Sequence, residues 1–161
     1  MPSSVYVESS IVSYLTSRPS RDVVKAGRQA ITSDWWLKSK SQYDIYISAL
    51  VEDEISGGDP MAAARRLQAV ANIPSILITS EAQLLADALV ASKAVPDNSV
   101  RDALHIAIAA TQGIDYLLTW NFKHINNAET KALIARVIEA DGWGCPILCS
   151  PEELGGNDYE E

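Results

Sequence analysis

Five short apolar runs, separated by longer helical segments, restrict the folds that are open to this chain. Each run is rich in Val, Ile, Leu or Tyr, a composition typical of strands buried on both faces of a parallel sheet. The runs are Ser4–Glu8, Asp44–Ser48, Ser75–Thr79, Asp115–Thr119 and Pro146–Ser150. Because strands and helices alternate, we expect an α/β fold. Right-handed crossovers would place helices on both faces of a five-stranded parallel sheet, as a three-layer α/β/α sandwich.

Residues that begin and end helices mark the segments between these runs. Asp59 before Pro60 is an N-cap followed by a proline in the first turn, and Ser80 with Gln83 has the spacing of a capping box. The predicted helices span residues 21 to about 40 (as one helix or two), 48–55, 60 to about 72, 80 to about 92, 99–113 and 128–141.

The composition predicts a single globular domain, since 47% of the 161 residues are hydrophobic. We expect residues 1–154 to form it and the polar, acidic segment 155–161 to be a flexible tail. No secretory signal is evident, and no apolar run approaches the roughly 18 residues of a membrane span, so a cytoplasmic protein is expected. Cys145 and Cys149 are expected to be buried thiols, because neighbouring positions on one strand suit a disulfide poorly.

The charge balance excludes one mode of nucleic-acid binding but not another. With 13 basic and 21 acidic side chains the net charge is −8, which argues against a broad basic binding face. A metal-dependent nuclease remains compatible, because bound cations supply local positive charge. The chain has no phosphate-binding glycine-rich loop, no Gly-x-Ser-x-Gly motif and no paired histidines for zinc.

Two polar residues follow predicted strands at the edge where open parallel sheets bind ligands. Glu8 ends the first run and Asn121 follows the fourth. A carboxylate after a buried strand suits a metal or a reacting group, although Glu8 is alternatively a solvated loop acid or a charge that stabilises the next helix. Asn121 offers a neutral oxygen ligand or holds a water, and is alternatively a turn residue.

Two further acids lie on predicted helices. Helical spacing places Glu54 on the same face as Leu50 and Val51, so its side chain is expected to point toward the domain rather than toward solvent. Asp102 has capping-box spacing from Ser99, which is a purely structural alternative to a functional role. Carboxylates that converge from separate segments are the ligands that a hard cation such as Mg²⁺ or Mn²⁺ prefers.

Three basic side chains accompany these acids. His105 lies one helical turn after Asp102, where it is either a packed residue or a group that supports a metal or phosphate site. Lys123 and His124 follow Asn121 and either bind a substrate phosphate or lie on the surface.

These motifs resemble those of the PIN-domain nucleases, in particular the VapC-type toxins of toxin–antitoxin pairs. The segment from Val5 to Leu15 resembles the opening strand, acid, hydroxyl residue and first helix of the family. Ser48 to Glu54 resembles its second acidic motif, and Asp102 to Ala107 is close to its third. Leu117 to Asn121 resembles the fourth, where many members carry Asp. The resemblance covers nearly the whole chain, with the motifs in order.

The resemblance implies a strand order of 3-2-1-4-5 and Mg²⁺- or Mn²⁺-dependent cleavage of RNA phosphodiester bonds. By motif position, Glu8, Glu54 and Asp102 become metal ligands, and Asn121 takes the fourth acidic place. Ser9, Thr119 and His105 would orient ligands or water around them. Family members usually dimerise and are blocked by an antitoxin that occupies the active-site groove, so a homodimer, an antitoxin and an RNA substrate are the expected partners.

Two departures from the family pattern bear on activity. Glu8 stands where the family usually has Asp, and Asn121 removes one negative charge, which favours a single tightly held metal. The alternative function is a PIN-like binding or assembly module with weak or no catalysis. A phosphatase or phosphotransfer domain is a weaker alternative, because it needs a nucleophilic Asp at the end of the first strand, where this chain has Glu8.

Overall fold

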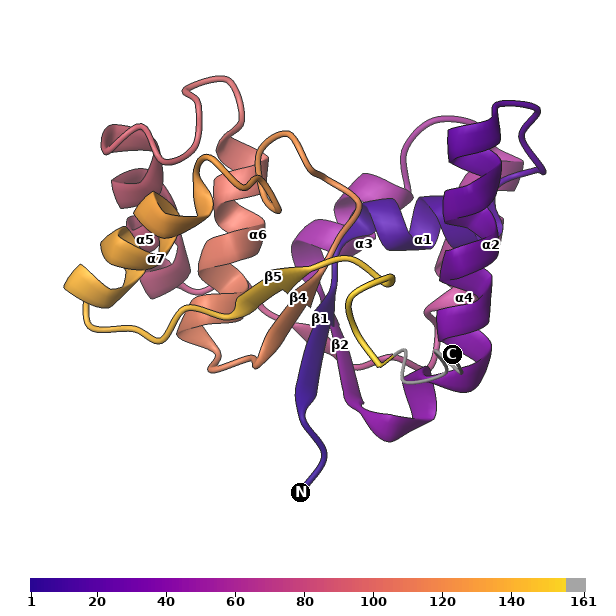
Figure 1. Ribbon diagram of the computed structural model, residues 1–161, viewed down its shortest axis with the longest axis horizontal. Coiled ribbons are helices and arrows are strands. Elements are labelled where there is room, and N and C mark those ends of the chain that lie inside the picture. The colour runs from indigo at the N-terminus through magenta and orange to yellow at the C-terminus, as the bar shows by residue number, and fades with distance from the viewer. Residues whose placement is uncertain (156–161) are drawn as a thin grey trace, which may run out of the picture.

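The computed structural model describes residues 1–155, which form a parallel sheet covered by helices on both faces (Figure 1). Its five strands pair in the order β3-β2-β1-β4-β5, as the resemblance implies, and every pair is parallel. The strands are β1 (Ser4–Val7), β2 (Asp44–Ser48), β3 (Ser75–Ile76), β4 (Tyr116–Leu118) and β5 (Ile147–Cys149). The predicted fold class and strand order are therefore confirmed.

The helices form two layers that flank the sheet. Figure 1 shows α1 to α4 on one side and α5 to α7 on the other. They are α1 (Ser9–Thr16), α2 (Val23–Lys38), α3 (Ala49–Ile55), α4 (Pro60–Ala69), α5 (Ser80–Ala91), α6 (Val100–Thr111) and α7 (Lys131–Ala140), with a short 3₁₀ helix at Lys40–Gln42. The segment predicted as one helix or two is thus one α-helix followed by a 3₁₀ turn.

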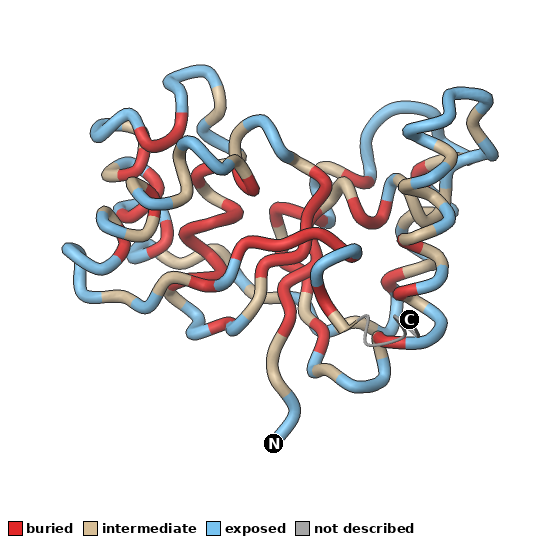
Figure 2. Tube along the Cα trace, in the orientation of Figure 1, coloured by how far each residue is buried: buried red, intermediate tan, exposed pale blue. Residues whose placement is uncertain are grey.

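The core follows the centre of the sheet and the helix packed against it. All three residues from Val5 to Val7 are inaccessible to solvent, and α6 buries seven side chains, among them small alanines that let it lie close to the sheet. Figure 2 shows this buried stretch through the middle of the molecule. Trp35 is also buried, and Trp36 packs against the core. Among the described residues, no helix is long and apolar enough to cross a membrane.

Two predicted helix caps were wrong in detail. Thr79 rather than Ser80 caps α5, because its hydroxyl accepts from the Ala82 amide at 3.1 Å. Ser99 precedes α6, but its backbone (φ −123°, ψ 40°) is not the extended conformation usual for an N-cap, and no side-chain cap hydrogen bond forms. The Ser99 hydroxyl instead donates to the Asn98 side chain. Asp102 is therefore not part of a working capping box.

The third predicted strand and the burial predicted for Cys145 also differ from the structure. β3 has only two residues because its partner β2 ends at Ser48, where α3 begins, so residues 77–79 have no strand to pair with. Cys149 is buried in β5, whereas Cys145 precedes the strand and is half-buried; both are free thiols. The predicted tail lies, from residue 156 onward, outside the described residues.

Candidate active site

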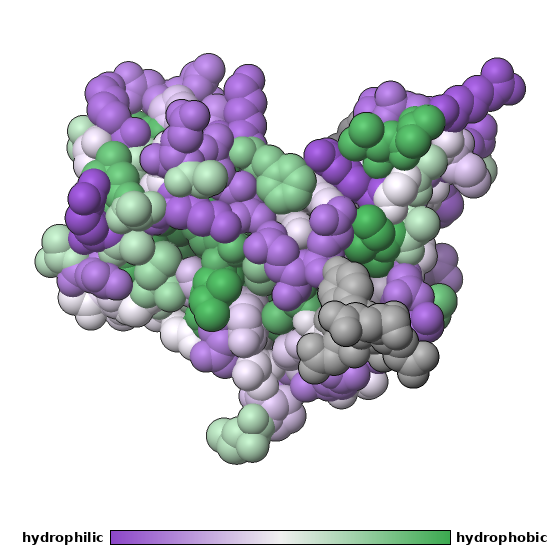
Figure 3. Space-filling model, in the orientation of Figure 1, coloured by the Kyte–Doolittle hydropathy of each residue, from purple (hydrophilic) through white to green (hydrophobic). Residues whose placement is uncertain are grey.

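The acidic residues meet at the carboxyl edge of the sheet because of strand order. β1 and β4 are neighbours, with Val7 opposite Leu118, and the Glu8 amide donates to the Leu118 carbonyl at 3.1 Å. The residues that follow the two strands therefore lie side by side, although they are far apart in the sequence. Figure 3 shows that the molecule is hollowed on this side, between the layer formed by α1 to α4 and that formed by α5 to α7.

Glu8 is a buried carboxylate held by three donors. It is only 6% exposed, so it is not a solvated loop acid. It caps α1 by accepting from the Ser10 amide at 3.1 Å, which confirms that it stabilises the helix start. The Thr119 hydroxyl donates to Glu8 Oε1 at 2.6 Å, and the Ser10 hydroxyl donates to the same oxygen. Capping and ligand positioning are thus compatible at this residue.

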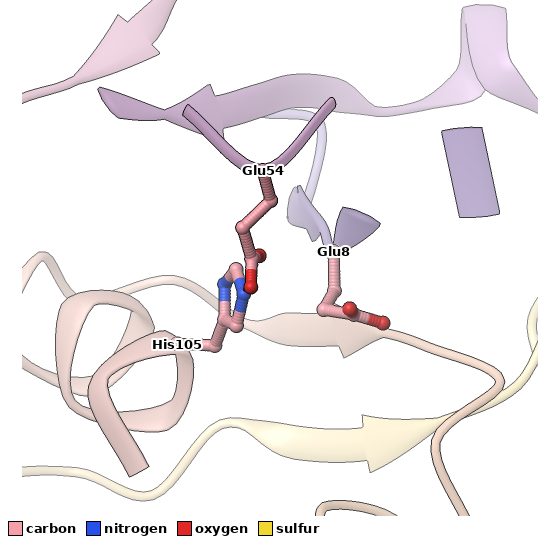
Figure 4. Close-up of side chains that lie close together, drawn as sticks. All are labelled: Glu8, Glu54 and His105. Carbon is pink, nitrogen blue, oxygen red and sulfur yellow. The ribbon is translucent and has the colours of Figure 1, made fainter. Parts of the chain in front are cut away.

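Glu54 reaches the site from α3 with its side chain 24% exposed. Its Oε1 accepts from Ser9 Oγ at 2.6 Å and from His105 Nε2, and Figure 4 shows the carboxylate and the ring pointing toward each other. Burial alone raises the Glu54 pKa, but hydrogen bonding and charge from His105 act against it. With Ser9 and the Arg101 guanidinium, 3.8 Å away, adding to that effect, the pKa lies below its ordinary value.

Behind His105 runs a buried chain of hydroxyl groups. Tyr6 Oη lies 2.6 Å from His105 Nδ1 and 2.7 Å from Ser48 Oγ, which in turn accepts from the Val51 amide at 3.2 Å. Burial strongly raises the Tyr6 pKa, so the phenol keeps its proton. The ionised Glu54 only accepts, so His105 Nε2 is the donor to it. In the neutral ring Nδ1 then accepts from Tyr6, whose oxygen accepts from Ser48, and every hydroxyl proton has a partner.

Asp102 lies in the first turn of α6, half-buried and close to two other site residues. Burial raises its pKa above the ordinary value, and the negative charge of Glu8 adds to the effect. A hydrogen bond from the Asn121 side chain and the nearby His105 and His124 rings oppose this shift without cancelling it. A bound cation would relieve the repulsion between the Asp102 and Glu8 carboxylates.

The Asn121 amide oxygen is bonded to the backbone. Its Oδ1 accepts from the His124 amide at 2.9 Å, which is the turn geometry considered for Asn after a strand. The Asn121 side chain also lowers the pKa of Asp102, against the effect of burial. Asn121 is therefore a turn residue that also favours the charged form of Asp102.

The structure brings some predicted site residues together more tightly than others. Ligand atoms of Glu8, Glu54 and His105 all lie within 4.8 Å of one another (Figure 4). Asp102, which was predicted as a ligand, lies outside this group, although the charges of Glu8 and His105 act on its pKa. A cavity of about 390 Å³ opens beside it, lined by Glu54, Arg101 and Asp102 among others. The oxygen-rich donor set suits a hard divalent cation, with the carboxylates as ligands.

The positions of the remaining predicted residues differ. Ser9 and Thr119 each donate to a site carboxylate, as expected of groups that orient ligands. His124 is half-buried and acts electrostatically on Asp102, whereas the Lys123 side chain is exposed. Phosphate binding by Lys123 and His124 stays a prediction.

Comparison with known proteins supports the fold but gives no close relative. No protein-family model matches the chain, and no curated protein matches it in sequence. Among solved structures, VapC20 of Mycobacterium tuberculosis, described as a toxin that cleaves the sarcin–ricin loop, superposes with a TM-score of 0.54 at 17% identity, over 70% of this chain and 86% of VapC20. VapBC2 of Rickettsia felis, bound to a DNA fragment from its promoter, superposes with a TM-score of 0.52 at 13% identity, over 91% of this chain and 98% of the other. The chain has the VapC-type PIN fold.

Within this VapC-type PIN fold, four supporting residues escaped the sequence analysis. Ser10 joins Glu8 to the loop after β4, since its Oγ also accepts from the Trp120 amide at 2.8 Å. Tyr6 and Ser48 support His105 from the core, and Arg101 flanks Glu54. The only signal in the sequence was local: polar hydroxyls in otherwise apolar strands, and a second serine after the acid.

Proposed function

We propose that this protein is a metal-dependent endoribonuclease, the toxin of a toxin–antitoxin pair. The observation that carries the proposal is the cluster of Glu8, Glu54 and His105 at the carboxyl edge of a VapC-type PIN sheet, with Asp102 close enough for the charge of Glu8 to act on its pKa. The similarity to VapC20 supports RNA as the substrate, and that to VapBC2 supports an antitoxin partner.

In this proposal, Glu8, Glu54 and Asp102 hold Mg²⁺ or Mn²⁺. When bound, the cation supplies an activated water and stabilises the negative charge that develops on the phosphate. The work of the protein is to hold the carboxylates in position. Hydroxyl donors fix Glu8 from two sides, and His105 with Ser9 fixes Glu54.

Asn121 is central to the proposed metal stoichiometry. It stands in the fourth acidic place of the family pattern, where it adds no charge. Three carboxylates under-neutralise two divalent cations, which favours one tightly held metal. The amide also favours the charged form of Asp102, which is compatible with activity.

A second candidate function, a PIN-like binding or assembly module without catalysis, is favoured by the same Asn121. In both cases the proposed protein is cytoplasmic and dimeric, with a cognate antitoxin over the acidic groove. A calorimetric Mn²⁺ titration separates the candidates, because the non-catalytic module predicts no binding with Glu8 and Asp102 intact.

The decisive experiment is cleavage of labelled RNA by antitoxin-free protein, first in EDTA and then with Mn²⁺ restored. Cleavage is expected only with the metal, and Asp102→Asn is expected to abolish it together with growth arrest on expression. Asp87→Asn, at an exposed position of α5, is the matched control and should cleave like the wild type. Unchanged cleavage by Asp102→Asn would sink the assignment.

A further inference from the structure

One basic side chain near the acids is held by aromatic rings rather than by a carboxylate. The guanidinium of Arg28, on α2, lies 5.3 Å from the centre of the Trp120 ring and 5.2 Å from that of Phe122. Its Nη1 is 3.4 Å from the Tyr14 hydroxyl. We call Arg28 with Tyr14, Trp120 and Phe122 the arginine clamp. Such cation–π contacts fix the position of the charge while its in-plane donors stay available.

The base of the clamp is rigid and its rim is open. Trp120 is only 4% exposed, and its indole nitrogen donates to Thr32 Oγ1 at 2.7 Å. Phe122 is 38% exposed and packs edge-on against Trp120. The clamp therefore presents a half-buried cation beside an accessible aromatic ring.

The charge of Arg28 has no acidic partner among residues 1–155. The salt bridges within that part of the chain join Asp or Glu to Lys38, Lys93, Arg101 and His105. Of the five guanidinium donors, one is used within the described residues, by the Tyr14 hydroxyl. In a chain with a net charge of −8, an unpaired, pre-positioned cation suits an anion brought by a ligand.

The clamp is joined to the candidate metal site by one loop. The Trp120 amide donates to Ser10 Oγ, and Ser10 holds Glu8. Asn121 lies between the two aromatic residues of this loop, and its side chain acts on the pKa of Asp102. The same short segment thus borders the acids on one side and the arginine on the other.

We propose that the arginine clamp binds the RNA strand beside the cleavage site, with Arg28 on a neighbouring phosphate and Phe122 against a base. The inference rests on the proposed function and names a subsite for its substrate. A phosphodiester offers the paired oxygens that a guanidinium fork fits, and exposed aromatic rings stack on bases of any sequence. An acidic protein segment would use the charge but has no need of the ring.

The test is fluorescence anisotropy with fluorescein-labelled single-stranded RNA in EDTA, where cleavage does not interfere, over a series of salt concentrations. Arg28→Met keeps the packing on the rings but removes the charge. It is expected to weaken binding and to reduce the slope of log K against log salt by about 0.7, the value for one phosphate contact on a single strand. Arg28→Lys should keep the wild-type salt slope. Phe122→Ala should weaken RNA binding without changing the salt slope.

The control is Arg136→Met on the exposed face of α7, which removes the same charge elsewhere and should keep the slope. The inference is overturned if Arg28→Met keeps the wild-type slope, if Arg136→Met lowers it equally, or if the wild type does not bind RNA. It is also overturned if Arg28→Met loses binding only to a fluorescein-labelled polyglutamate peptide. Failure of the proposed function is separate, because it shows as absence of Mn²⁺-dependent cleavage by the wild type.

Discussion

Replacing Tyr6 with Phe is expected to destabilise the protein, because its hydroxyl is the middle of the buried chain that supports His105. The change keeps the ring and removes one oxygen. It leaves His105 Nδ1 without its donor and the Ser48 proton without its acceptor, and the side chains of both residues are at most 1% exposed. A buried polar group without a partner costs about 1–3 kcal/mol, so two such groups are expected to cost about 2–6 kcal/mol.

The assay is urea unfolding in the absence of metal, with thermal unfolding as a second measurement. For a domain of this size each kcal/mol lowers the Tm by about 2–4 °C, so the loss corresponds to a fall of roughly 4–24 °C, with an unchanged urea m-value. Tyr46→Phe is the matched control. Tyr46 lies opposite Tyr6 in the paired strands, is half-buried, and makes no hydrogen bond through its hydroxyl within residues 1–155. This control is expected to stay within about 0.5 kcal/mol of the wild type.

A result in which Tyr6→Phe loses no more stability than Tyr46→Phe would refute the argument for a directed hydrogen-bond chain. Nitrogen NMR of the imidazole gives an independent readout. The wild type should show His105 with its proton on Nε2, and Tyr6→Phe should lose that preference. The signals are assigned by comparison with His124→Gln, which removes the other histidine of the chain.

Three further predictions concern charge, metal and thiols. Without metal, Asp102→Asn should raise the free energy of unfolding at neutral pH and Glu54→Gln should lower it, as measured by urea titrations from about pH 3 to 8. The folded-state pKa of Asp102 is raised, so its negative charge destabilises the folded protein until the pH falls through that pKa. The folded-state pKa of Glu54 is lowered, so its charge stabilises the folded protein above the unfolded-state pKa. This stabilisation is lost as the pH falls through the folded-state pKa. Mn²⁺ at about 100 times its Kd should stabilise the wild type by about 2.7 kcal/mol in thermal unfolding, and an equal gain in Glu8→Gln would contradict the ligand assignment. Burial raises the pKa of Cys145 to about 11 and that of Cys149 to about 12. Ellman's reagent at pH 8 should therefore react slowly with both thiols in the native protein and rapidly in guanidinium. Fast labelling of the native protein would argue against buried thiols.

Local patterns in the sequence were sufficient for the element types. Alternation of short apolar runs with capped helices predicted the α/β sandwich. Helical spacing predicted that the Glu54 side chain points toward the domain. The order of the strands came only through the resemblance, since periodicity does not say which strands pair. Capping was predicted less well: Ser99 has the right spacing to Asp102 but the wrong backbone conformation to cap.

By itself the sequence determined which chemistry is available: three carboxylates and an amide after buried strands or on inward helix faces. The tertiary structure alone decided how these groups are held. Thr119 meets Glu8 across 111 residues of sequence because neighbouring parallel strands bring distant segments to one edge. Tyr6 on β1 meets His105 on α6 across 99 residues, and the aromatic rings around Arg28 likewise come from separate elements, which no local pattern encodes.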